Sequence, residues 1–367
     1  MSYFQPDYID FDFKAVEEAI SKHFIILDSY ILDNRYVFEI STVEDNLKNK
    51  FVELKKELKE LGNYIPFMDK HGEKIIITVF KRIEHKEDKR RPIILFVATL
   101  ATILIDGYLR SNSPIYSDIL GNYNPWYMTI LFTIALLGII GVHELGHKLV
   151  LLKYGVEASW PNFIPGIPGI FPTFGAIITQ REPPTNRDEL FDIGLAGPLF
   201  GLLVTIIVSF YAAATAPVIS LDKLHVLDAK YGKAQAFPVP ILYILIQNIV
   251  KPLHPGEVII VNPLVWAAVV GFILTGLNLL PAWQLDGGHL ARATVGPKYH
   301  RISTILSVIA LFVLGYWAMA LLIAFLYFIS GGASARPLDD VSKLSNSRKI
   351  IFIISLILAF LCLPPGF

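Results

Sequence analysis

Residues 126–150 read WYMTILFTIALLGIIGVHELGHKLV, and this stretch decides the fold. Its first part, Trp126 to Val142, contains no charged side chain. An α-helix needs about 20 apolar residues to cross about 30 Å of hydrocarbon, so the stretch predicts a membrane-spanning helix. The helix ends in three ionisable side chains, His143, Glu144 and His147. Charged groups inside a membrane helix cost about 2.5–3.5 kcal/mol each and are usually functional, so we expect chemistry at this helix end.

The pattern H-E-x-x-H on a helix is typical of a zinc site. Residues i and i+4 share one helix face, so the imidazoles of His143 and His147 can bind the same Zn²⁺. Glu144 then lies beside the water that such a site activates. The alternative is that both histidines are polar residues at the membrane interface without a metal. The cost of placing three ionisable groups there favours the metal site.

A second stretch supplies the missing ligand of the predicted site. A hydrolytic zinc site needs a third protein ligand and an open position for water. Residues 278–289 read NLLPAWQLDGGH, at the end of another apolar run. Pro281 ends or kinks that helix and the Gly287–Gly288 pair permits a sharp turn, so Asp286 can point back toward the metal. Taken alone, an Asp-Gly more commonly only forms a turn. His289 competes for the ligand role, and we expect it beside the site instead.

Apolar runs of spanning length follow the Arg90–Arg91 pair. Besides 126–150, we place spans at residues 92–109, 190–214, 259–280 and 350–363. The run 302–329 is either one span or a hairpin about Gly315. Residues 241–250 are too few to cross and are predicted to be interfacial or re-entrant.

The basic residues predict which side of the membrane the loops occupy. Lys and Arg accumulate in short cytoplasmic loops. Six basic residues precede the first span: Lys81, Arg82, Lys86, Lys89, Arg90 and Arg91. Four lie between the second and third spans: Lys148, Lys153, Arg181 and Arg187. Three follow the fourth span: Arg292, Lys298 and Arg301. The N-terminal domain and the zinc site are therefore expected on the cytoplasmic side. Arg336, Lys343, Arg348 and Lys349 fit the same side only with the hairpin about Gly315.

Residues 1–91 are predicted to form a separate cytoplasmic α+β domain, and residues 92–367 the membrane domain with its core at 126–290. The first segment holds 34 of the 64 charged residues. It contains helical patterns at 13–20 and 43–61 and strand patterns at 36–40 and 74–80. Its first residues carry Asp7, Asp10 and Asp12 and no apolar core, so we expect no cleavable signal peptide.

Composition excludes several classes of protein. Hydrophobic residues make up 53% and charged residues 17%, which excludes a single soluble globule. The formal net charge is zero, so nucleic acid is not an expected partner. The chain has one cysteine, Cys362, which excludes an internal disulfide and a cluster of thiolate ligands. A metal must therefore be held by histidine and carboxylate.

Residues 161–180 contain too much proline and glycine for a spanning helix and predict a re-entrant loop with short strands. Such backbone is tolerated at membrane depth only when it is buried in protein or lines a wet cavity. One hypothesis is that Gly175 to Thr179, including Ile177, offers a strand edge to which an unwound substrate pairs. The alternative is an interfacial loop that only shields the zinc.

Together these motifs resemble the site-2 protease family of intramembrane zinc metalloproteases. The resemblance rests on the two metal motifs, on Gly194–Pro198 and on Phe171–Ile178, and covers roughly residues 92–365. It is closest to the branch of archaeal, cyanobacterial and plant plastid members without a PDZ domain. It implies one Zn²⁺ held by His143, His147 and Asp286, with Glu144 as general base. It also implies that Asn278 binds the substrate backbone or the oxyanion.

The resemblance implies a polytopic α-helical membrane protein with about six transmembrane helices, a re-entrant β-containing segment and the small N-terminal domain. The implied function is hydrolysis of a peptide bond in or near a transmembrane segment of a membrane-protein substrate, in regulated intramembrane proteolysis. The implied partners are that substrate and the lipid bilayer, and the oligomeric state stays open. The rivals are a membrane zinc transporter and a catalytically inactive substrate-binding homologue. A transporter would distribute polar residues along a path, and an inactive homologue usually loses the base or a ligand.

Overall fold

The structure is a computed structural model that describes residues 11–41, 46–82, 90–121 and 123–364. The chain folds into two compact units. The first combines residues 11–82 with Pro183–Leu190 and Arg336–Asn346, and the second contains the remaining described residues. Each unit is described by itself.

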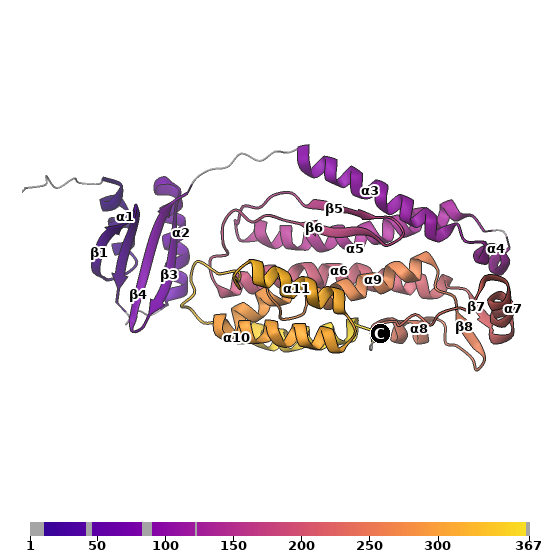
Figure 1. Ribbon diagram of the computed structural model, residues 1–367. Helices are drawn as coiled ribbons and strands as arrows, with labels where there is room; N and C mark the ends of the chain where they lie inside the picture. The colour runs from indigo at the N-terminus through magenta and orange to yellow at the C-terminus, as the bar shows by residue number, and fades with distance from the viewer. Residues whose placement is uncertain (1–10, 42–45, 83–89, 122, 365–367) are drawn as a thin grey trace, which may run out of the picture. The chain divides into compact units, whose positions relative to one another are not determined.

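The first unit is an α+β domain. Its antiparallel sheet has the order β1-β2-β4-β3, from β1 (Ile26–Leu32), β2 (Arg35–Ile40), β3 (Tyr64–His71) and β4 (Lys74–Lys81). Helices α1 (Phe11–Ser21) and α2 (Leu47–Gly62) pack against the sheet (Figure 1). Val16 of α1 and Phe51 and Leu54 of α2 are fully buried with Phe38 and Ile77 of the sheet.

Within the described residues, both predicted helices and both predicted strands of this domain are confirmed. Strands β1 and β3 were not predicted. Residues 43–45 of the second predicted helix lie outside the described part of the chain. Both missed strands are joined to a neighbour by two residues. The turn between β1 and β2 has Asp33 and Asn34 at φ 48° and 59°, and the turn between β3 and β4 has Gly72 at φ 63°. Two-residue hairpin turns need residues at positive φ, which Asp, Asn and Gly adopt most readily, so the sequence of both turns was compatible with a hairpin.

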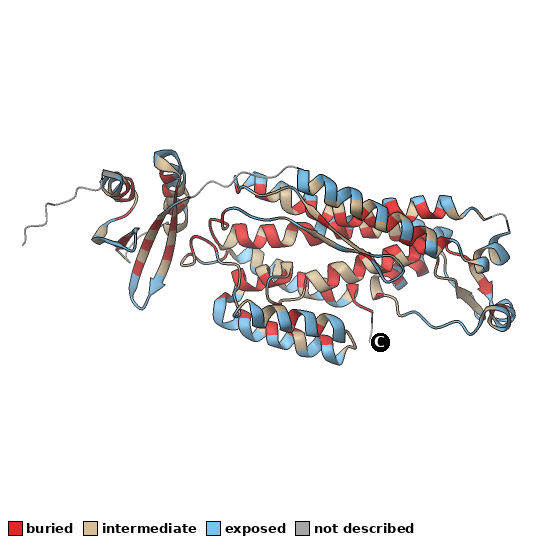
Figure 2. Ribbon diagram, turned by 45° about the horizontal axis from the view of Figure 1, so that its top comes forward, coloured by how far each residue is buried: buried red, intermediate tan, exposed pale blue. Residues whose placement is uncertain are grey.

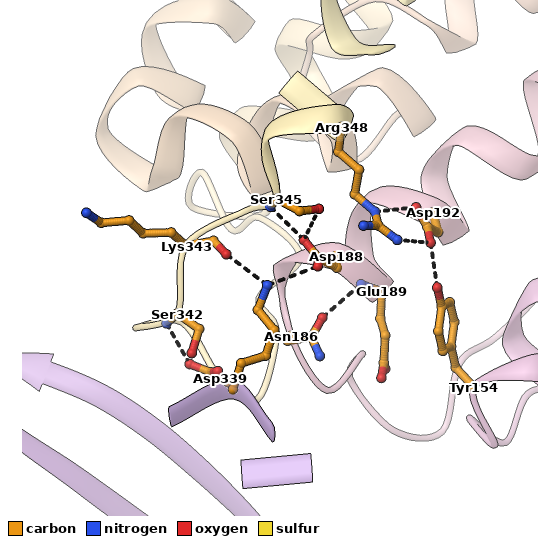
Figure 3. A network of polar contacts seen from close by, with 11 residues as sticks. Tyr154, Asn186, Asp188, Glu189, Asp192, Asp339, Ser342, Lys343, Ser345 and Arg348 are labelled. Atoms are coloured by element: carbon orange, nitrogen blue, oxygen red, sulfur yellow. Dashed lines mark hydrogen bonds and ion pairs between the residues drawn. The ribbon is translucent and has the colours of Figure 1, made fainter. Parts of the chain in front are cut away.

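Two later segments complete the edge of this sheet beside β3. The backbone N–H of Met68 donates to the Leu338 carbonyl at 2.7 Å, and the Leu338 N–H donates to the Pro184 carbonyl at 2.8 Å. Asp188 accepts from the backbone N–H of Ser345 at 3.0 Å (Figure 3) and from Lys48 Nζ at 2.9 Å. The sheet edge at β3 is therefore covered by the chain itself, which removes an exposed pairing edge.

The second unit is mainly helical. Its long helices are α3 (Arg90–Ser111), α5 (Pro125–Lys153), α6 (Arg187–Thr215, from Phe191 in this unit), α9 (Pro263–Asn278), α10 (Asp286–Val313), α11 (Trp317–Ile329) and α12 (Asn346–Cys362). Short helices are α4 (Pro114–Leu120), α7 (Leu221–Tyr231) and α8 (Ile241–Val250), and a small sheet pairs β7 (Val218–Ser220) with β8 (Glu257–Ile259). By length and composition, α3, α5 and α6 are able to cross a membrane.

The second unit has a buried apolar core and, unlike a typical soluble protein, also a largely apolar exposed surface. Buried residues concentrate along α5 and α9 in the middle of the bundle, whereas α3, α10 and α11 expose more of their surface (Figure 2). Many exposed side chains are large and apolar, for example Ile134 at 64%, Ile207 at 61% and Phe328 at 85% exposure. An apolar surface of this extent is typical of a protein whose helices face lipid.

The run 302–329 is a helical hairpin. Helix α10 ends at Val313, Gly315 adopts φ 86°, and α11 begins at Trp317 and packs back against α10. The left-handed conformation at Gly315 has no steric penalty because glycine lacks a Cβ. Of the two alternatives for this run, the structure shows the hairpin.

Residues 161–180 form a β-hairpin, as the broken pattern predicted. Strand β5 (Asn162–Ile167) pairs antiparallel with β6 (Phe171–Ile177), Asn162 opposite Ile177. The hairpin lies between α3 and α5 and runs along α5 (Figure 1). It therefore covers the helix that carries the H-E-x-x-H motif.

Candidate metal centre

The helix α5 presents both histidines of the motif on one face. His143 and His147 are four residues apart, and their Nε2 atoms lie 3.2 Å from each other. His143 is buried, with 5% of its surface exposed. This confirms that the i, i+4 spacing brings the two rings together.

Asp286 joins them from a distant part of the chain. It is the first residue of α10, directly after the loop that follows α9. Its Oδ2 lies 3.2 Å from His143 Nε2, and its Oδ1 lies 3.3 Å from His147 Nε2. The donor atoms of the three residues all lie within 4.8 Å of one another, so the chain brings together the predicted ligand set.

The spacing of these donors fits zinc. Zn²⁺ binds histidine nitrogen and carboxylate oxygen at about 2.0–2.2 Å in a tetrahedron, which separates neighbouring ligand atoms by about 3.3–3.5 Å. The two Nε2 atoms are 3.2 Å apart, and each lies 3.2–3.3 Å from a carboxylate oxygen of Asp286, Oδ2 for His143 and Oδ1 for His147, so the spacing is compatible with a zinc ion between them. Two imidazoles and one carboxylate also leave the fourth position for water or substrate, as in hydrolytic zinc sites.

A backbone carbonyl fixes the orientation of His147. Its Nδ1 lies 2.7 Å from the carbonyl oxygen of Ile193 on α6. A carbonyl only accepts hydrogen bonds, so Nδ1 carries the proton and Nε2 presents its lone pair toward Asp286 and His143. Bonds of this kind hold the ring of a metal ligand in place and set its tautomer.

Three glycines of α6 make room for the ligand set. A Cβ at Gly197 would lie 2.0 Å from His147 Nε2, and one at Gly201 would lie 3.1 Å from His143 Cβ. A Cβ at Gly194 would lie 2.9 Å from the Asp286 carbonyl oxygen. The G-x-x-x-G spacing of Gly197 and Gly201 is typical of close helix packing, and here the packing partners are the proposed metal-binding residues.

The two glycines after Asp286 also serve close packing. Both lie in the first turn of α10, where a Cβ at Gly287 would be 2.1 Å from the Leu279 carbonyl oxygen and one at Gly288 would be 2.3 Å from that of Trp283. We expected these glycines to permit a sharp turn behind Asp286, and this reason was wrong, because both lie in the helix that begins at Asp286. Glycine is needed at both positions because the preceding loop packs too closely for a Cβ.

The loop that delivers Asp286 is anchored at Trp283, which has the left-handed φ of 43°. The Trp283 N–H donates to the Thr304 hydroxyl at 2.9 Å, and His300 Nε2 donates to the Trp283 carbonyl at 3.0 Å. A bulky residue at positive φ persists only where its surroundings hold it. Both anchors come from the part of α10 that follows a break at Gly296, where φ is 77°, and not from the turn that begins with Asp286.

The structure gives a position for each of the other predicted site residues, Glu144, Asn278, Gly175 and Ile177. Glu144 is buried and directly follows His143 in α5, and its role as general base stays a prediction. Asn278 is the last residue of α9, and its role stays a prediction. Gly175 and Ile177 lie in β6, where the Gly175 N–H donates to the Thr173 hydroxyl at 3.1 Å and Ile177 is 56% exposed. Their contact with a substrate also stays a prediction.

Asp192, at the beginning of the membrane part of α6, has a structural partner. Its carboxylate accepts two hydrogen bonds from Arg348 of α12, at 2.7 and 2.6 Å, and one from the Tyr154 hydroxyl (Figure 3). Bidentate pairs of this kind are strong and geometrically specific. The next residue is Ile193, so the network fixes the backbone that orients His147. Neither the Ile193 carbonyl nor Arg348 was found from the sequence, because no local pattern connects them to the site.

An apolar cleft opens beside the metal-binding helix. Its volume is about 610 Å³, and it lies where α3, α5 and the beginning of β5 meet. It is lined by Pro92, Ile93, Phe96, Gly141, Leu145, Lys148, Trp160, Pro161 and Phe163. Gly141, Leu145 and Lys148 lie on the face of α5 opposite to His143 and His147, so the cleft and the metal centre adjoin this helix on different sides.

Comparison with known proteins finds a matching family model and several curated relatives. The family model described as Peptidase family M50 matches residues 131–322, which include all three proposed ligands. The chain is 29% identical over 235 residues to the probable zinc metalloprotease EGY2, chloroplastic, of Arabidopsis thaliana, covering 62% of the chain and 40% of that relative. It is 33% identical over 238 residues to the probable zinc metalloprotease EGY1, chloroplastic, of the same plant, covering 63% and 42%.

A third relative matches a longer part of the chain. The probable zinc metallopeptidase EGY3, chloroplastic, of Arabidopsis thaliana is 26% identical over 294 residues, covering 75% of the chain and 48% of the relative. The chain thus spans less than half the length of these curated relatives. No solved structure matches the chain.

Proposed function

The chain belongs to peptidase family M50, the site-2 protease family, and from its site geometry we propose that it is an intramembrane zinc metalloprotease. One observation carries the proposal: the donor atoms of His143, His147 and Asp286 converge within 4.8 Å although nearly 140 positions separate them. Glu144 adjoins this set in the buried part of the same helix. The substrate is a membrane protein cleaved in or near a transmembrane segment, in regulated intramembrane proteolysis.

In this proposal His143, His147 and Asp286 hold one Zn²⁺, which when bound polarises the scissile carbonyl and lowers the pKa of water toward about 7. Glu144 takes a proton from the attacking water and delivers it to the amide nitrogen that leaves. Ile193 keeps His147 in the tautomer that the site needs, through the bond to Nδ1. Asn278, at the end of α9, is proposed to bind the substrate backbone or the oxyanion.

The helices support a topology of about six spans. Helices α3, α5 and α6 have spanning length, and α9, the α10–α11 hairpin and α12 supply shorter or broken apolar segments. The basic loops before α3 and after α5 favour a cytoplasmic N-terminal domain and zinc site. The topology and the sidedness are both parts of the proposal.

Chelation tests the metal requirement of the proposed activity. We expect 1,10-phenanthroline to abolish cleavage of a single-span model substrate in proteoliposomes, and one equivalent of Zn²⁺ to restore it, because cleavage depends on the metal. Cleavage and bound zinc are measured in the same samples. The non-chelating 1,7-phenanthroline is the control. Full cleavage by protein that has been stripped of zinc would contradict the proposal.

Substrate is proposed to pair with the edge of β6. Among the described strands, only β5 pairs with β6, and Ile177 at its end is 56% exposed. An extended peptide that adds to such an edge gains backbone hydrogen bonds, and unwinding exposes the carbonyls that a substrate helix would otherwise hide. The apolar cleft between α3 and α5 is proposed to receive the adjoining helical part.

Ile177→Pro tests this pairing. Proline removes the backbone N–H and clashes with a neighbouring strand, so we expect loss of cleavage with one zinc per chain retained. Ile177→Val keeps the N–H and the β-branched side chain and is the matched control. Both variants are assayed for cleavage and for zinc content. Normal cleavage by the proline variant would instead support a hairpin that only shields the metal.

A further inference from the structure

A buried ion pair in α3 has no part in the metal centre. Asp106 has no exposed surface, and its Oδ2 accepts from Arg110 Nε, one helical turn later, at 2.6 Å. A charged pair inside a spanning helix is costly and marks a functional position more often than a structural one. The pair lies toward the end of α3 that is remote from Arg90.

The second oxygen of Asp106 binds the turn of the β5–β6 hairpin. The backbone N–H of Gly169 donates to Asp106 Oδ1 at 2.7 Å, in a turn where Gly169 adopts φ 87°. One helical turn earlier, the Thr102 hydroxyl donates to the Pro172 carbonyl at 2.8 Å. Thr102 and Asp106 share one face of α3, so this helix holds the hairpin at two points around its turn.

The same cluster reaches a third element. The guanidinium of Arg110 lies 3.7 Å from the ring centre of Trp266 in α9, a cation–π contact. Asp106 and Arg110 thereby connect α3, the hairpin turn and α9. The chain continues from α9 through the loop that carries Asp286.

The hairpin itself extends from this anchor to the metal-binding helix. Phe163 of β5 packs at Gly141 of α5, where an added Cβ would lie 3.9 Å from the Phe163 ring. A shift of the hairpin along α5 would move β6, the strand proposed to pair with the substrate, and would therefore weaken substrate binding.

We propose that Asp106 is a positioning residue: it holds the β5–β6 hairpin in the placement in which β6 receives the substrate strand. The inference rests on the proposed function and adds to it the residue that fixes the substrate-binding strand from far outside the metal centre. Asp106 does not touch the substrate or the metal. Its effect passes through the Gly169 N–H.

The test separates the hydrogen bond to Gly169 from the burial of charge. Asp106→Leu combined with Arg110→Leu removes both charges together, which leaves no unpaired buried ion and is often neutral for stability. Asp106→Asn retains an acceptor for Gly169. Thr99→Val removes a fully buried hydroxyl from the same face of α3, one for which the structure shows no hydrogen-bond partner among the described residues, and is the matched control.

Kinetics in proteoliposomes with the single-span substrate give the first readout. We expect KM to rise about tenfold in the double variant, because a lost hydrogen bond to a charged group corresponds to about that factor. kcat and the zinc content stay within about twofold, and Asp106→Asn has a KM nearer to wild type. Thr99→Val matches wild type.

Hydrogen exchange of the hairpin gives a second readout that needs no activity. Amides of residues 167–173 exchange faster in the double variant than in wild type and Thr99→Val, whereas those of α5 are unchanged. An unchanged KM and unchanged exchange overturn the proposal. So does a loss of zinc or of kcat without a rise in KM, since that marks a merely structural role. If wild type does not cleave at all, the proposed function fails, and exchange at 167–173 still decides whether Asp106 holds the hairpin.

Discussion

We expect Glu144→Gln to abolish the proposed proteolysis and to leave one zinc per chain. The amide has nearly the shape of the carboxylate but cannot accept the proton of the attacking water, and general-base catalysis contributes about 10²–10⁴-fold. The three ligands lie on His143, His147 and Asp286, so the substitution removes none of them. We therefore expect cleavage to fall by about 10³-fold or more with zinc retained.

The measurement compares wild type and Glu144→Gln for cleavage of the single-span substrate and for zinc by elemental analysis. Leu152→Met, at an exposed position of the same helix outside the apolar cleft, is the control and is expected to behave as wild type. A zinc transporter with this ligand set would continue to move metal after the change, and an inactive homologue would show no difference between the two proteins. Cleavage that survives in Glu144→Gln would remove Glu144 from the mechanism.

Gly197→Ala is expected to release the metal without touching a ligand. The new Cβ would lie 2.0 Å from His147 Nε2 and 2.5 Å from its Cδ2, far inside van der Waals contact. His147 can avoid it only by turning, which breaks the bond of Nδ1 to the Ile193 carbonyl and moves Nε2 away from Asp286. Changes to groups that orient a metal ligand lower metal affinity about 10- to 100-fold, and we expect at least that.

Alanine substitutions at two other glycines of the contact between α5 and α6 are controls that should reduce zinc affinity less. Gly201→Ala places its Cβ 3.1 Å from His143 Cβ, a tight but relaxable contact, and Gly138→Ala meets Val204 at an ordinary 3.7 Å. We therefore expect zinc affinity to be highest in Gly138→Ala, lower in Gly201→Ala and lowest in Gly197→Ala. Zinc affinity is measured by competition with a chromophoric chelator. Full zinc affinity in Gly197→Ala would show that α6 does not pack against His147 as described.

The site was predictable where its geometry is local. His143, Glu144 and His147 lie within about one helical turn, so helix periodicity alone places them together. Asp286 required more, because a residue so distant in sequence meets the histidines only through the packing of α9 and α10; the motif and the family resemblance supplied it. The strand content of residues 161–180 followed from proline and glycine, which exclude a spanning helix.

What the sequence could not indicate is set by tertiary packing. The sequence around Gly197 does not show whether this position faces lipid or another residue. Only the folded structure shows that it faces His147. The buried Asp106 was not recognised, because its partners Gly169 and Trp266 come from other parts of the chain. By contrast, the hairpin between β1 and β2 was readable from Asp33 and Asn34 and was missed.

The central claim is that His143, His147 and Asp286 hold one zinc ion. Zinc K-edge X-ray absorption of the purified protein tests it most directly, with Asp286→Ala alongside. The expected spectrum has two imidazole nitrogens and oxygen ligands at about 2.0–2.2 Å and no sulfur at about 2.3 Å. In Asp286→Ala we expect zinc to be lost or one oxygen to be missing. Full zinc with an unchanged ligand shell in that variant would contradict the account.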